Sequence, residues 1–225
     1  MPFLVLIVGG LILRIGSLRP RDVGLVRSHL GLGAGITVMT WLLMQATGAV
    51  TIVIQGRPLG LHDYWATAGV LAILGGFLGQ ILGNALFEEV IYRAFLMPQL
   101  ATKFERHLSG RASPWVFVLA LVVSQGVFAL IHVPGRLVDG VAVGSLLGFL
   151  AAPLLFGVLF VLVYYRTGNL FVAIGLHALV NDPVFLVNAG AVVLIPLLAV
   201  ILGILVGWPY VAPRVGRRDR RFTSV

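Results

Sequence analysis

The sequence predicts an all-α, polytopic membrane protein, and two features of its composition support that prediction. Of its 225 residues, 59% are hydrophobic and only 11% are charged, whereas about 25% of the residues of soluble domains are charged. The mean hydropathy is +1.04, and the length leaves room for about seven helices of roughly 20 residues each. Strands are not expected, because the apolar runs are too long for barrel strands and irregular backbone cannot face lipid. We therefore expect a single integral-membrane domain over residues 1–225.

Seven apolar runs define the expected spans, and the first three differ in length. Residues 1–13 reach only about 20 Å as a helix, so this first span is short, and no positively charged region precedes it as in a secretory signal. Residues 30–54 are long enough to cross a bilayer with some tilt. The third span opens at Ala66 and is expected to end near Leu100, because Pro98 and a polar segment follow.

The other four spans follow at short intervals. The fourth extends from Pro114 to His132, and the residues after it are polar enough to predict a loop. Pro153 predicts a kink in the fifth span. These expected elements are the loop 133–140, the fifth span 141–165, a tight turn 166–169, the sixth span 170–186 and the seventh span 189–206.

The distribution of positive charge predicts the topology. The net charge is +8, and the connections between successive spans carry four, one, three, one, one and no Lys or Arg, with five more in the tail 208–225. Cytoplasmic connections carry the excess of Lys and Arg, so we expect the N-terminus outside and the tail in the cytoplasm beside anionic lipid. The expected location is the plasma membrane of a prokaryote, with the lipid bilayer as partner and no nucleic acid.

Two glutamates and an arginine lie within the third span. Each charged side chain at bilayer depth costs at least about 2.5–3.5 kcal/mol, so such residues are paired and mark functional sites. Glu89 and Arg93 are four residues apart and share one helix face, which leaves Glu88 free for chemistry. The alternative is a buried ion pair that only fixes helix packing, and that alternative gives Glu88 no purpose.

Two further pairs of residues, each one helical turn apart, lie in later spans. Phe128 precedes His132, and His177 precedes Asn181. A carboxylate and an imidazole together can activate water as general base and acid, and Asn181 with His177 can supply donors to a developing oxyanion. Phe128 is interpreted either as apolar lining or as a substrate-binding residue. Serine catalysis is disfavoured, because no Gly-x-Ser-x-Gly motif is present, and the absence of cysteine excludes thiol catalysis and Cys-ligated zinc.

The three motifs together resemble a known family. Glu88-Glu89-x-x-x-Arg93, Phe128-x-x-x-His132 and His177-x-x-x-Asn181 look like the motifs of the CAAX protease and bacteriocin-processing family (CPBP, Abi, type II CAAX endopeptidase-like) of intramembrane endopeptidases. The similarity covers about residues 66–186, the expected catalytic core. It implies that Glu88 activates water beside His132, that Glu89 and Arg93 support the site, and that His177 and Asn181 stabilise the oxyanion.

The resemblance leaves the cofactor and the substrate open. Glu88, His132 and His177 can in principle hold zinc with an open position, but the HExxH spacing is absent, so we favour a mechanism without a cofactor. The substrate implied is a membrane-associated protein or peptide, with prenylated C-termini as one family option. The competing hypotheses are a zinc-dependent version of the same protease, a non-catalytic immunity or scaffold protein of the membrane, and a proton-coupled transport protein.

Overall fold

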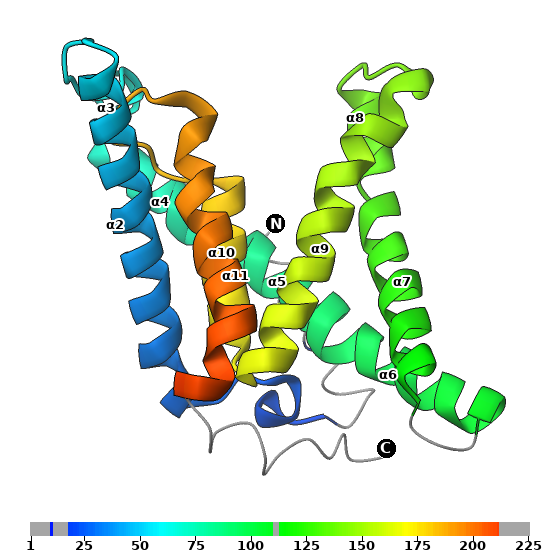
Figure 1. Ribbon diagram of the computed structural model, residues 1–225. Helices are drawn as coiled ribbons and strands as arrows, with labels where there is room; N and C mark the ends of the chain where they lie inside the picture. Colours follow the sequence, from blue (N-terminus) through cyan, green and yellow to red (C-terminus); the bar gives the residue numbers. More distant parts are fainter. Residues whose placement is uncertain (1–9, 11–17, 110–112, 212–225) are drawn as a thin grey trace.

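The computed structural model describes residue 10 and residues 18–109 and 113–211 of the chain (Figure 1). In these residues the chain is helical, and the only β-type pairing is an isolated bridge between Leu61 and Val187. The elements are η1 (Pro20–Val23), η2 (Arg27–His29), α2 (Leu30–Ile54), α3 (Tyr64–Ala68), α4 (Val70–Gly79), η3 (Gln80–Ala85), α5 (Leu86–Glu88), η4 (Glu89–Leu96), α6 (Met97–Phe104), η5 (Glu105–Ser109), α7 (Pro114–Leu130), α8 (Val133–Val138), η6 (Val143–Ser145), α9 (Leu146–Thr167), α10 (Leu170–Asn181), η7 (Gly190–Val193) and α11 (Leu194–Val211).

The all-α prediction is confirmed, whereas the count of seven spans is not. The described residues contain five helices that are long and apolar enough to cross a membrane. The short apolar helix α10 is additional, and the expected first span over residues 1–13 lies outside the described residues apart from Gly10. The five long helices cover Pro20–Ile54, Val70–Leu108, Pro114–Val138, Val143–Thr167 and Gly190–Tyr210.

Several predicted boundaries are correct and others are wrong. Helix α2 has the predicted bounds, α7 begins at Pro114 as expected, and Gly168 forms the predicted turn with a φ of 64°. The third span does not end near Leu100, because the helix continues to Leu108, with Pro98 inside it directly after the π-helical stretch η4. The predicted loop 133–140 is instead largely helix α8, which has its own proline in the first turn.

Helix α10 ends five residues before the predicted end of the sixth span. Residues that precede a proline avoid the α conformation, and Asp182, which precedes Pro183, has φ −143° and ψ 89°. Residues 182–189 therefore leave the helix. Non-helical backbone at membrane depth is tolerated only where its polar groups are bonded within the protein.

Side chains of α2 and α3 satisfy this requirement for the irregular segment 182–189. The amide of Gln45 donates to the carbonyl of Pro183 at 3.4 Å and accepts from the N–H of Leu186 at 2.8 Å. The indole of Trp41 donates to the carbonyl of Val184, and that of Trp65 donates to the carbonyl of Phe185. The segment is thus attached to two other helices.

Helix α10 lies at the centre of the packing. All its residues from Val172 to Leu179 are buried, and it packs against α2 and α9 (Figure 1). Glycines allow the close approach to α2, since a side chain at Gly175 would collide with Thr37 and one at Gly33 would collide with Phe171. Helices α7 and α9 form a second pair that leans away from α2 and α11. The helix that contains α5 and η4 crosses between these two groups of helices (Figure 1), and it holds the charged residues of the third span.

Candidate active site

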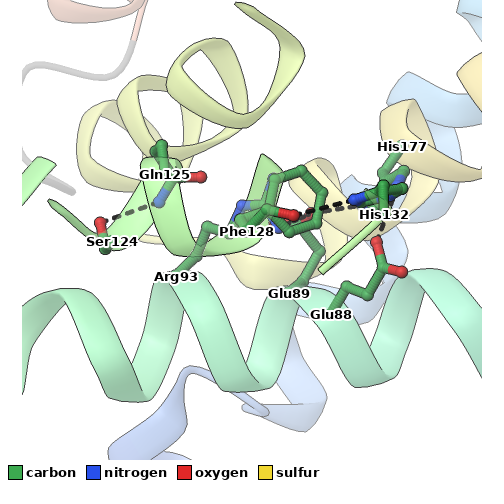
Figure 2. A network of polar contacts seen from close by, with 8 residues as sticks. All are labelled: Glu88, Glu89, Arg93, Ser124, Gln125, Phe128, His132 and His177. Carbon is green, nitrogen blue, oxygen red and sulfur yellow. Dashed lines mark hydrogen bonds and ion pairs between the residues drawn. The ribbon is translucent and has the colours of Figure 1, made fainter. Parts of the chain in front are cut away.

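Residues from the three motifs meet where α5 and η4 pass beneath α7 and α10 (Figure 2). Glu88 ends α5, Glu89 and Arg93 lie on the π-helical stretch η4, and His177 lies in α10. The exposed fractions of these four residues are 7%, 0%, 0% and 4%, respectively. Wide π turns inside α-helices occur often at functional sites, and here such turns hold Glu89 and Arg93.

The predicted pairing of Glu89 with Arg93 is confirmed. Nη1 of Arg93 lies 3.4 Å from Oε1 of Glu89, and both side chains are fully buried. The guanidinium also lies over the ring of Phe128, with Cζ 4.0 Å from the ring centroid, and more distantly over Phe160. A cation over an aromatic face is attracted by the ring quadrupole, so Arg93 is held by a carboxylate and an aromatic ring together.

His177 lies between the two glutamates, which the sequence did not indicate. Its Nδ1 is 2.7 Å from Oε1 of Glu89, and its Nε2 is 3.4 Å from Oε2 of Glu88. The ring stacks on Phe160 with 4.9 Å between centroids. One face of the imidazole is therefore fixed by an aromatic ring while each nitrogen faces a carboxylate, so its orientation is strongly determined.

His132 follows the end of α7 and is half-buried. Its Nδ1 lies 2.8 Å from the carbonyl oxygen of Phe128. A carbonyl oxygen only accepts, so Nδ1 carries the proton, and in the neutral ring Nε2 keeps its lone pair. His132 also lies close enough to Glu88 for their charges to interact. The imidazole of His132 thus lies near the carboxylate of Glu88 (Figure 2).

Phe128 is surrounded by the other members of the site. It is 2% exposed, and its ring makes edge-to-face contacts with Tyr92 at 5.1 Å and with His132 at 5.0 Å between centroids. These contacts give Phe128 a packing role. Its expected contact with substrate stays a prediction.

Asn181 is the last residue of α10 and is exposed, one turn beyond His177. The contacts found within the described residues link His177 to the glutamates and to Phe160 rather than to Asn181. The oxyanion role of His177 with Asn181 therefore also stays a prediction.

Three residues that the sequence analysis did not single out complete the site. Phe160 of α9 stacks on His177, and Tyr92 packs against Phe128. Gln125 of α7 is fully buried beside Ser124, to whose hydroxyl it donates at 3.0 Å. A buried amide in an apolar span was a visible signal for Gln125, whereas nothing distinguishes Phe160 from the other aromatic residues of its span.

A zinc centre is not indicated by the arrangement of the side chains. Among the described residues, no three His, Asp or Glu side chains are grouped so that they could hold a metal ion. Nδ1 of His132 bonds a backbone carbonyl and Nδ1 of His177 bonds Glu89, which leaves Nε2 of each ring as the nitrogen that could bind a metal. Glu88, His132 and His177 are not grouped closely enough to hold zinc in this structure, and we assign no step of the reaction to a metal.

The fold and the site define an integral membrane protein with a buried cluster of two glutamates, an arginine and a histidine. The family model described as type II CAAX prenyl endopeptidase Rce1-like matches residues 64–182, and the chain belongs to this family. Membership implies a CAAX-type intramembrane endopeptidase that acts on a membrane-associated peptide. No curated protein and no solved structure matches the chain.

Proposed function

We propose that the protein hydrolyses a peptide bond of a membrane-associated protein or peptide, using water activated by Glu88 together with His132. The observation that carries the proposal is the division between the two glutamates. Glu89 is engaged by both Arg93 and His177, while Glu88 pairs only with His177 among the ion pairs of the described residues. Glu88 is therefore the carboxylate available for proton transfer.

The proposed reaction uses these groups in sequence. Water held between Glu88 and Nε2 of His132 loses a proton to the carboxylate as its oxygen attacks the scissile carbonyl carbon. The resulting oxyanion accepts hydrogen bonds from His177 and Asn181. The proton on Glu88 then passes to the leaving amine as the C–N bond breaks, which restores the carboxylate. Glu89 and Arg93 hold His177 in place throughout.

The family name directs the choice of first substrates. Prenylated peptides with a CAAX C-terminus are the first choice, and membrane-associated peptides without a prenyl group are the alternative. The proposed setting is the plasma membrane of a prokaryote, with the N-terminus outside and the tail 208–225 in the cytoplasm.

The test uses the full chain in lipid nanodiscs with farnesylated and unmodified CAAX peptides, and the products are identified by mass spectrometry. Glu88→Gln should reduce hydrolysis by at least about 10²-fold, the scale of general base catalysis. Glu105→Gln, a glutamate on η5 outside the site, is the matched control and should retain activity. Full activity of Glu88→Gln would refute the proposed base.

A second arm of the experiment tests metal dependence. Hydrolysis should continue in the presence of a chelator that removes tightly bound zinc. Loss of activity that added zinc restores would instead support the zinc-dependent version of the protease.

A further inference from the structure

Gly157 of α9 lies at the contact between α9 and α7, directly behind the site. It is buried, and a Cβ at this position would lie 2.7 Å from Oε1 of Gln125 and 3.0 Å from Cδ1 of Phe128. The distance to Gln125 is shorter than packed heavy atoms tolerate, and the distance to Phe128 would require the ring to shift by a few tenths of an ångström, because carbon contacts are optimal at about 3.5–4.0 Å. The backbone of α9 therefore forms the surface against which both side chains rest.

Neither side chain has free space in which to move. Gln125 is fully buried, and its Nε2 donates to Ser124, which is also fully buried. The ring of Phe128 is enclosed on its other sides by Arg93, Tyr92 and His132. Protein interiors transmit such displacements because they are close-packed. A displacement of Phe128 by α9 would reach Arg93 and His132 directly.

We propose that Gly157 is a positioning residue for the hydrolytic site: its lack of a side chain sets the location of Phe128, and through it that of His132 and Arg93 relative to Glu88. This inference deepens the proposed function and rests on it. Gly157 belongs to none of the three motifs, and it touches none of the groups that we assign to the reaction. Its role is to let α9 approach α7 closely enough to hold Phe128 against the catalytic residues.

The first test compares Gly157→Ala with Gly148→Ala in the peptide hydrolysis assay. Gly148 lies on the same helix, and a Cβ there meets nothing within 4 Å, so both variants gain the same helix propensity. Gly157→Ala should lower kcat by about 10- to 100-fold, since small misplacements of catalytic groups have effects of this size. KM should change less than about threefold, and Gly148→Ala should behave as the wild type. Unchanged kcat in Gly157→Ala would overturn the proposal.

The second test does not depend on activity. The chain has five histidines, and ¹⁵N-histidine NMR reports the hydrogen bonding of each ring. Gly157→Ala should shift the signals of His132 and His177, assigned with His132→Gln and His177→Gln, whereas Gly148→Ala should leave all five in place. If the wild type cleaves no peptide, the proposed function fails, and the NMR comparison still decides whether Gly157 positions the histidines.

A further variant covers the case in which Gly157→Ala does not fold. Gln125→Ala opens the same contact instead of crowding it, and it should lower kcat and shift the His132 signal. Wild-type kcat and unshifted signals in Gln125→Ala would refute the positioning role.

Discussion

Removing the charge of Arg93 should destabilise the fold, because Glu89 is then buried without its arginine partner. Replacement by Met keeps the length and apolar character of the stem but removes the charge. Glu89 then remains fully buried with only His177 as an ionic partner. Breaking a buried ion pair by removing one member costs about 3–5 kcal/mol, and the contact of Arg93 with Phe128 is lost as well.

The structure narrows the expected loss in the free energy of unfolding of Arg93→Met. The hydrogen bond between Nδ1 of His177 and Oε1 of Glu89, 2.7 Å long, remains in the variant, so we expect a loss near the lower end, about 3 kcal/mol. Glu89→Gln should have a comparable effect, because it leaves the guanidinium buried. The double variant Glu89→Gln with Arg93→Met removes both charges and should be more stable than the sum of the single effects predicts, by about 1–3 kcal/mol.

The free energy of unfolding can be measured in bicelles by denaturant titration, with tryptophan fluorescence as the signal, for the wild type, both single variants and the double variant. Strictly additive effects, or a cost below about 1 kcal/mol for Arg93→Met, would contradict the assignment of Glu89 and Arg93 as a coupled structural pair.

Two further predictions concern the opposite end of the bundle. Gln45→Leu should lower the free energy of unfolding by about 2–4 kcal/mol, because it leaves the carbonyl of Pro183 and the N–H of Leu186 unpaired, whereas the exposed Gln55→Leu should have little effect in the same titration. Burial, and secondarily the charge of Asp182, raises the pKa of Tyr64 above its ordinary value of 10.0. A phenol with a raised folded-state pKa contributes stability that is complete below about pH 10 and is lost as the pH rises through the folded value. The wild type should therefore lose stability more steeply than Tyr64→Phe above about pH 10, and parallel curves for the two proteins would contradict this.

Features of the fold that depend on local sequence were predictable. The bounds of α2 and the start of α7 lie where apolar runs meet charged or proline-containing segments, and the Glu89–Arg93 pair follows from helical spacing alone. The early end of α10 also had a local cause, Pro183, that a count of apolar residues did not take into account. Hydrophobicity defined the spans, and backbone restrictions decided where some of them ended.

Contacts between segments that are far apart in the sequence were less predictable. His177 was expected beside Asn181 because the two residues share a helix face, yet its ring nitrogens face Glu88 and Glu89, which lie 89 and 88 residues earlier. The helix periodicity fixes which residues share a face but not which helix that face meets. The stacking of Phe160 on His177 depends on the same tertiary packing.

The irregular segment 182–189 affects how the bundle can move. Its carbonyls bond to Gln45, Trp41 and Trp65, so α2, α3 and the end of α10 are joined at this end of the molecule. Helices joined in this way should move together as a rigid body. The movement that admits a substrate to Glu88 is therefore expected in another part of the bundle. The pair α7 and α9, which leans away from the rest of the bundle (Figure 1), is where we expect the hinge motion.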